Sequence, residues 1–355
     1  MRYITLITFA LLGLSNASKS ALFEQYHTQR QTAGFRNFTE INQQPVIGVI
    51  SQSLETEMKG DSRFQGYGSY VMQAYVDWVE AAGARVVPLI RGEDPEVTKR
   101  KLKGLNGVLM PGGDGDYHDY GRLVLDIVKE MNDNGTYLPI WGTCAGQHEL
   151  LSYVSSAGWD VLDVYDMDSA SLTIEFPYGD PSNFAMFAGM GPDAWLLTEY
   201  NVTYNSHHWS LDPYKFQIDR GLMAFFKPTS ISRMPDGRKF VASMETTGLN
   251  AYYPFYGTQF HPEKAANIFN PTQAVNHQWE SVLLNGYFAD FFVQECRKNP
   301  QRYGNYSETQ KDIIQNHKLI VSTEWFDNVY VFEGSSAYRL MVSVGLAMAA
   351  FAMLI

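Results

Sequence analysis

The sequence predicts an α/β fold of three layers, in which a mostly parallel central sheet is flanked by helices and carries an antiparallel extension. Two observations predict it. In the first half, short β-branched runs alternate with helical patterns of about ten to fifteen residues, as in βαβ units around a parallel sheet. In the second half, Pro235, Asp236 and Gly237 form a turn between two strand-like runs, which indicates an antiparallel hairpin.

The elements of the parallel half follow from hydrophobic periodicity and from stop residues. Residues 45–50 are β-branched and bounded on both sides, which predicts a fully buried strand. A helix over 68–82 has its apolar side chains on one face and stops at Gly83. The same criteria predict strands over 85–90, 107–110 and 138–141, and helices over 95–102, 120–132 and 145–154.

The second half is less regular. Its β-rich runs predict strands over 195–200, 225–234, 238–244 and 254–260, followed by a long helix with an apolar face over 274–298. We find neither an internal repeat nor a low-complexity linker, so we expect one domain over residues 45–320.

Composition limits the class of protein and its partners. The chain has 355 residues and is 45% hydrophobic, which can supply a sizeable core. Its formal net charge is -11, and Lys and Arg form no run. Binding to nucleic acid needs clustered cations that replace phosphate counterions, so we expect no nucleic-acid partner.

The N-terminal residues indicate a secretory route. Residues 1–17 have the form of a signal peptide, with Arg2, an apolar stretch and then small residues; the alternative is a short buried helix. Glycosylation sequons, which agree with this route, begin at Asn37, Asn134, Asn201 and Asn305. We therefore expect the mature protein in a lysosome or vacuole, or outside the cell.

The C-terminal tail, residues 340–355, is apolar except for Ser343. It is short for a hydrocarbon layer of about 30 Å. Upstream, Gly334, Ser335 and Ser336 are the small residues that a GPI-transfer site needs, although the polar spacer after them is shorter than usual. The tail is a GPI signal or a membrane anchor, and the sequence leaves both open. A homodimer is also left open by the sequence.

The chain has two cysteines, Cys144 and Cys296, and an oxidising compartment would allow one disulfide between them. Cys144, however, stands between a buried strand and a helix, with Gly142 before it and Ala145 and Gly146 after it. Such a turn lifts a side chain to the carboxyl edge of the sheet, where ligands of open α/β folds bind. The helix N-terminus there favours a thiolate, so Cys144 is a candidate nucleophile that has to stay free.

A thiolate nucleophile needs a proton carrier, and His261 is the candidate. Pro262 is expected to keep the chain extended, so that His261 and Glu263 share a face and the carboxylate orients the imidazole. An anionic intermediate also needs donors. The loop of Gly112 and Gly113 after the 107–110 strand can supply one, from Gly113, and the Ala145 N–H a second.

Each of these features is common alone, but together they end three strands of one α/β pattern, which favours catalysis. The segments AGARVVP, NGVLMPGG, WGTCAG, HHWSL and YGTQFHPEK closely resemble the γ-glutamyl hydrolases, peptidase family C26 of the class I glutamine amidotransferase-like superfamily. The likeness runs from residue 45 to about residue 295. One departure is Phe260, where a Trp is common in that family.

The resemblance implies hydrolysis of γ-glutamyl amide bonds, foremost in folate poly-γ-glutamates, with no cofactor and no metal. Cys144 would be the nucleophile, His261 the base and then the acid, and Glu263 the residue that orients it. His207 would line the pocket, and we expect Gly112 at the substrate as well. Because a polyglutamate is anionic, Lys264 is a candidate for its carboxylates, with a solvated lysine as the alternative.

Three other interpretations stay open. The first is a glutaminase-type amidotransferase subunit, since the superfamily shares the Cys and the His-x-Glu pair. The second is a non-catalytic surface binding protein held by the tail. In the third, Cys144, His148 and His261 hold a metal ion, because a Cys and a His four residues apart can meet on one helix face.

Overall fold

The computed structural model describes residues 42–247, 253–321 and 327–334. Its main sheet has seven strands in the order β4-β1-β5-β6-β11-β10-β9. The first five pair in parallel, whereas β10 pairs antiparallel with both β11 and β9, which confirms the predicted fold class. The strands are β4 (Arg85–Leu89), β1 (Val46–Ile50), β5 (Gly107–Met110), β6 (Ile140–Thr143), β11 (Phe255–Thr258), β10 (Lys239–Thr246) and β9 (Phe226–Arg233).

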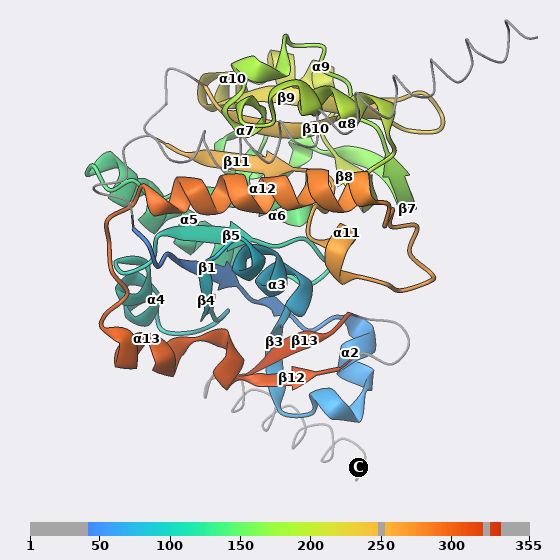
Figure 1. Ribbon diagram of the computed structural model, residues 1–355. Coiled ribbons are helices and arrows are strands. Elements are labelled where there is room, and N and C mark those ends of the chain that lie inside the picture. Colours follow the sequence, from blue (N-terminus) through green and yellow to red (C-terminus); the bar gives the residue numbers. More distant parts are fainter. Residues whose placement is uncertain (1–41, 248–252, 322–326, 335–355) are drawn as a thin grey trace, which may run out of the picture.

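Helices cover both faces of this sheet, and Figure 1 shows the long α12 in front of it, running in roughly the same direction as β11. On one face α3 (Gln73–Ala81) and α12 (Trp279–Arg297) share a core cluster with Trp141. The second core cluster lies on the other face. It takes side chains from α4 (Pro95–Leu102), α5 (His118–Asp133), α6 (Ala145–Val154), α9 (Pro213–Ile218) and α10 (Arg220–Phe225).

Local chemistry accounts for these elements. Every residue of β1 is buried, as expected for a central strand whose two faces are both covered by helices. Asp94 caps α4 by accepting a hydrogen bond from the Glu96 N–H at 2.8 Å, and Pro95 takes the first helical position. Gly83, with φ of 91°, ends the turn after α3.

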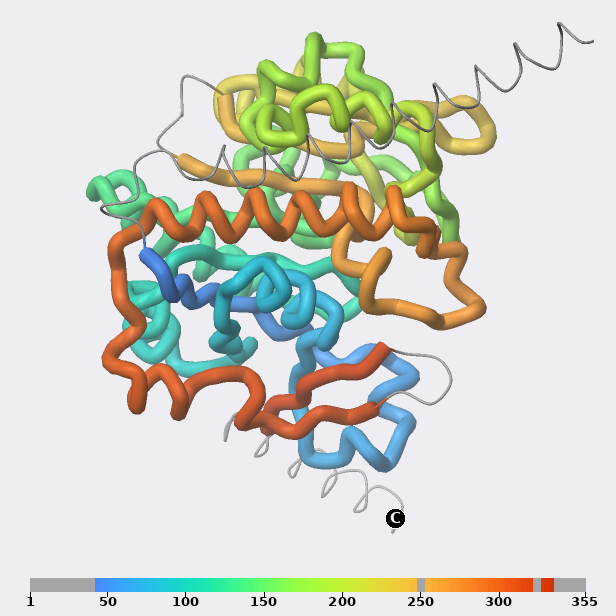
Figure 2. Tube along the Cα trace, in the orientation of Figure 1, coloured from blue at the N-terminus to red at the C-terminus, as the bar shows by residue number. Residues whose placement is uncertain are grey.

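The predicted helix over 68–82 is wrong in its first half. Tyr67–Met72 form the strand β3, and only Gln73–Ala81 are helical. β3 belongs to a second sheet of order β12-β13-β3-β2, with β2 (Gln52–Ser53), β12 (Lys318–Ile320) and β13 (Val329–Glu333). Figure 2 shows these early and late segments, blue and red, lying side by side. β13 pairs with β3 from beyond residue 320, so the folded chain continues past the expected boundary.

The predicted strand over 195–200 is also wrong. Pro192 opens a short 3-10 helix that runs into α8 (Leu196–Glu199). The strand in this region is β8 (Thr203–Ser210), which pairs with β7 (Asp163–Leu172), and the sequence patterns did not reveal either. The remaining helices are short: α2 (Thr56–Gly60), α7 (Ala185–Ala188), α11 (Lys264–Asn267) and α13 (Tyr306–Asp312).

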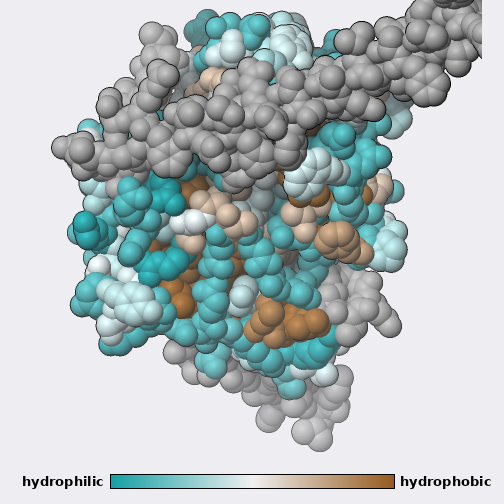
Figure 3. Space-filling view, viewed as in Figure 1, coloured by the Kyte–Doolittle hydropathy of each residue, from teal (hydrophilic) through white to brown (hydrophobic). Residues whose placement is uncertain are grey.

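On the face drawn in Figure 3, hydrophilic residues predominate, and the apolar patches are small and separate. Among the described residues, no helix has both the length and the apolar character needed to cross a bilayer. The expected signal peptide, the Asn37 sequon and the apolar tail lie outside the described residues.

Candidate active site

Three neighbouring strands bring the predicted residues to one edge of the sheet. β6 pairs in parallel with β5 on one side and with β11 on the other. The register joins Met110 with Gly142 and Thr143 with Thr258, so the three strands end level. Gly113, Cys144 and His261 follow these strand ends, and all three line a single cavity of about 860 Å³.

Cys144 occupies the sharp turn that the sequence predicts. Its φ is 50° and its ψ is −107°, and it alone among the described non-glycine residues has a positive φ. The turn needs small neighbours because the chain doubles back on itself: a Cβ on Gly142 would lie 2.5 Å from the Gly146 oxygen, and one on Gly146 would lie 2.0 Å from the Met110 oxygen. The backbone strain and the glycines together hold the sulfur at the sheet edge.

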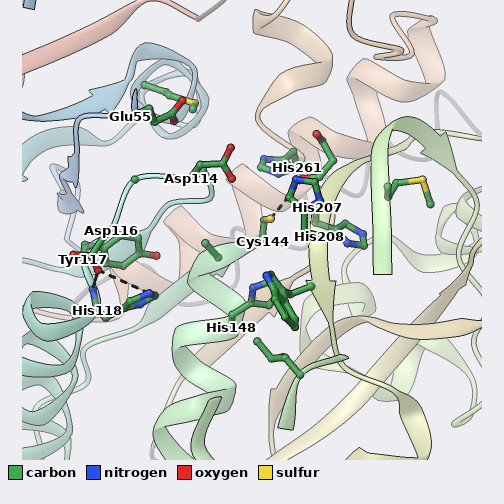
Figure 4. Close-up of a pocket in the computed structure, with 18 of the residues that line it drawn as sticks. Glu55, Asp114, Asp116, Tyr117, His118, Cys144, His148, His207, His208 and His261 are labelled. Atoms are coloured by element: carbon green, nitrogen blue, oxygen red, sulfur yellow. Dashed lines mark hydrogen bonds and ion pairs between the residues drawn. The ribbon is translucent and has the colours of Figure 1, made fainter. Parts of the chain in front are cut away.

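The sulfur lies at the N-terminus of α6, where Cys144 is the N-cap residue. The Gln259 side-chain N–H donates to it at 3.7 Å, and the Ser206 carbonyl oxygen lies 3.9 Å away. Figure 4 shows the Cys144 side chain pointing toward His207 and His261. Cys296 is a separate buried free thiol, so a disulfide between the two cysteines is ruled out by the structure.

His261 is held by Glu263, as predicted, but by a different backbone. The Nδ1–H of His261 donates to the Glu263 carboxylate at 2.7 Å. The chain is not extended here: it turns after His261, and Glu263 has helical angles of −67° and −21°. The turn, rather than strand geometry, therefore brings the two side chains together.

The electrostatics of this group favour a protonated His261. Burial by itself lowers the pKa of His261, but the Glu263 carboxylate and a hydrogen bond with the Cys144 sulfur outweigh it and raise that pKa to about 9. His261 is therefore an imidazolium at neutral pH, with Nδ1 on the carboxylate and Nε2 left for the sulfur.

The glycine loop after β5 is arranged by Tyr75, which the sequence analysis missed. The Gly112 N–H donates to the Tyr75 hydroxyl at 2.8 Å, and that oxygen lies 3.3 Å from Nδ1 of His261. The Gly112 carbonyl accepts from the Gln52 side chain at 2.7 Å. Both backbone groups of Gly112 thus bond within the protein, so the structure does not support its predicted contact with substrate.

Gly112 nevertheless has to be a glycine. A Cβ there would lie 2.7 Å from the His261 ring and 2.8 Å from the Cys144 Cβ. Gly113, with φ of 132°, and Ala145 both line the cavity, as expected of the two oxyanion donors. Tyr75 escaped notice because it lies on the apolar face of its helix, where a tyrosine is indistinguishable from a core residue.

The other predicted binding residues also line the cavity. His207 is buried edge-on against Phe240, and burial lowers its pKa to about 3, so it is neutral. The Lys264 ammonium donates to Gln273 at 2.9 Å and lies 3.6 Å from the Asp327 carboxylate. The Lys264 ammonium is therefore buried and already paired, because the Asp327 carboxylate offsets its charge.

The structure gives no support to the metal interpretation. His148 is buried, burial lowers its pKa to about 4, and its Nε2 bonds to Gln259 at 2.9 Å. Within the three described ranges, no group of three His, Cys, Asp or Glu side chains is placed to hold a metal ion. Gln259 therefore links His148 to the Cys144 sulfur without a cation.

Three of the predicted sequons lie on the described part of the chain. Asn134, Asn201 and Asn305 are all exposed, as a glycan would require. Asn305 also caps α13, because its side chain accepts from the Glu308 N–H at 3.1 Å.

Comparison with known proteins agrees with the geometry. The family model described as Peptidase C26 matches residues 45–156. Gamma-glutamyl hydrolase B of Dictyostelium discoideum is 30% identical over 312 residues, which cover 83% of this chain and 85% of that protein. The gamma-glutamyl hydrolase of Rattus norvegicus is 32% identical over 281 residues (77% and 84%), and that of Homo sapiens 31% over 302 residues (81% and 90%).

Proposed function

The chain belongs to the γ-glutamyl hydrolase family, and on that premise we propose that it cleaves folate poly-γ-glutamates at their γ-glutamyl amide bonds. It is a cysteine-dependent hydrolase, and the products would be glutamate or glutamyl peptides. The observation that carries the proposal is the His261 ring, bonded to the Glu263 carboxylate and to the Cys144 sulfur at the mouth of one cavity.

Acylation begins with the protonated His261 beside the Cys144 sulfur. The Cys144 thiolate attacks the γ-carbonyl carbon, and the carbonyl oxygen becomes an oxyanion that accepts from the N–H groups of Gly113 and Ala145. The C–N bond then breaks, and the His261 imidazolium gives its proton to the leaving amine. Glu263 keeps the imidazole oriented throughout.

In deacylation His261 acts as a base instead of an acid. The neutral His261 takes a proton from a water molecule, whose oxygen attacks the thioester carbon. The C–S bond breaks, the product leaves with a new γ-carboxyl group, and the thiolate–imidazolium pair is restored. His207, neutral and buried beside the sulfur, is placed to hydrogen-bond the substrate.

Product analysis on a defined pteroyl-γ-polyglutamate tests the proposal. We expect release of glutamate or glutamyl peptides, loss of turnover after alkylation with iodoacetamide, and no turnover by Cys144→Ala. Because Cys296 is fully buried, alkylation of the folded protein reports on Cys144. Free glutamine, assayed in parallel, addresses the glutaminase alternative: faster release of ammonia from glutamine would contradict the proposal.

We also propose that the protein enters the secretory pathway and acts in a lysosome or vacuole or outside the cell, with the tail as lipid-anchor signal or membrane anchor. Support comes from the residues at the two ends of the sequence and from the exposed sequons. N-terminal sequencing of the mature protein tests removal of the signal peptide. Release by a GPI-specific phospholipase tests the lipid anchor. Sedimentation shows whether the protein is a monomer or a dimer.

A further inference from the structure

The active-site cavity extends from Cys144 along α6 to a wall that the mechanism above does not use. Glu149 lies five residues beyond Cys144, which is about 8 Å along the helix axis. Its buried carboxylate bonds to Nδ1 of His118 at the start of α5. Figure 4 places His118 on the side of Cys144 opposite to His208.

Trp159 stands against this histidine. The two ring centroids are 4.3 Å apart in an edge-on arrangement, and the tryptophan lines the cavity. Trp159 is 42% exposed, so it keeps surface that a ligand in the cavity can contact. Glu149 holds His118 in place, and His118 packs against the Trp159 indole. The orientation of the indole is therefore fixed before a flat ligand binds.

The charges around the indole select the kind of partner. Asp116 and Asp160 line the same wall, and both are exposed. Asp116 bonds to Arg91 at 2.9 Å, and Asp163 nearby is paired with Lys215 at 2.7 Å. Cations thus offset two of these carboxylates, whereas the Asp160 carboxylate has no ion-pair partner among the described residues and is an acceptor beside the aromatic face.

A polyglutamate tail does not suit this wall, because its carboxylates would find Arg91 and Lys215 already paired and would lie beside the Asp160 carboxylate. A flat heterocycle with N–H donors suits it, because its ring can stack on the indole while its donors reach the carboxylates. We propose that Trp159, with Asp116 and Asp160, binds the pteridine end of the substrate on the acyl side of the scissile bond, a proposal that rests on the proposed function.

Two substrates that differ only in the aromatic end test it: pteroyl-γ-glutamyl-glutamate and N-acetyl-γ-glutamyl-glutamate. In Trp159→Ala we expect kcat/KM for the pteroyl substrate to fall about tenfold and kcat/KM for the acetyl substrate to change less than about twofold. Trp159→Phe keeps a ring and should lose only about two- to threefold. Trp195→Ala is the matched control, since Trp195 is 44% exposed but is not among the residues that line the cavity.

Binding of pteroic acid, which has no γ-glutamyl bond, is the second readout. Titration should give a dissociation constant about tenfold weaker for Trp159→Ala than for the wild type. Equal losses on both substrates, or no loss on either, would overturn the assignment while leaving the proposed function intact. If the wild type cleaves neither substrate, the proposed function itself fails, and this subsite with it.

Discussion

Replacing Glu263 by glutamine removes the charge that sustains the His261 imidazolium but keeps the shape of the side chain and an oxygen that can accept the Nδ1–H. The two groups are buried and in direct contact, with 2.7 Å between Nδ1 and the carboxylate oxygen. The pKa of His261 lies above its ordinary value, at about 9. Proton loss therefore occurs above neutral pH in the wild type, and activity should decline as pH rises through about 9.

The size of the effect follows from the separation. Unit charges about 4 Å apart interact by about 4 kcal/mol at an effective dielectric constant of about 20, which corresponds to about three pKa units. In Glu263→Gln we expect the alkaline limb of kcat/KM to move down by about two to three pH units. The pKa of His261 would then be about 6 to 7, so roughly a tenth to a half of the molecules would keep the proton donor at pH 7, and kcat/KM at neutral pH should fall about two- to tenfold.

The assay is the pH dependence of kcat/KM on a γ-glutamyl substrate, together with the pH dependence of Cys144 alkylation by iodoacetamide. Glu245→Gln is the matched control: Glu245 is also buried but accepts from the Ala185 and Met186 N–H groups, at 3.0 Å each, away from the cavity. Its pH profile should equal that of the wild type. An alkaline limb in Glu263→Gln at the wild-type pH would refute the ion-pair reasoning.

Three further substitutions, with one control, test the backbone and the hydrogen bonds that support the site. Tyr75→Phe leaves the buried Gly112 N–H without its partner at 2.8 Å, and we expect kcat to fall roughly tenfold with KM little changed and the free energy of unfolding to fall by about 1–3 kcal/mol. Cys144→Gly relieves the positive φ of 50°; calorimetry should show an inactive protein about 1 kcal/mol more stable than the wild type. Gly146→Ala places a methyl group 2.0 Å from a backbone oxygen and should cost about 3 kcal/mol or more in urea unfolding. Gly286→Ala, in a helix with open space around that Cβ, should not destabilise the fold.

Local patterns were sufficient wherever the physics is local. The strand, the small residues and the helix around Cys144 are contiguous in the chain, so the turn and its N-terminal dipole could be predicted. His261 and Glu263 are two residues apart, so their contact could be predicted even though the backbone between them turns. The alternation of strands and helices likewise predicts a parallel sheet, whose strand ends share an edge.

Long-range pairing decided what those patterns could not. Tyr67–Met72 extend a helical periodicity, but they form a strand because β13, more than two hundred residues later, pairs with them. Tyr75 and Trp159 look like ordinary apolar residues in the sequence. Only the packed structure places one hydroxyl between the glycine loop and His261, and one indole on the cavity wall. The sequence by itself determined which residues can do the chemistry; the order β5-β6-β11 decided that they meet, because adjacency in a sheet is a tertiary property that no local propensity encodes.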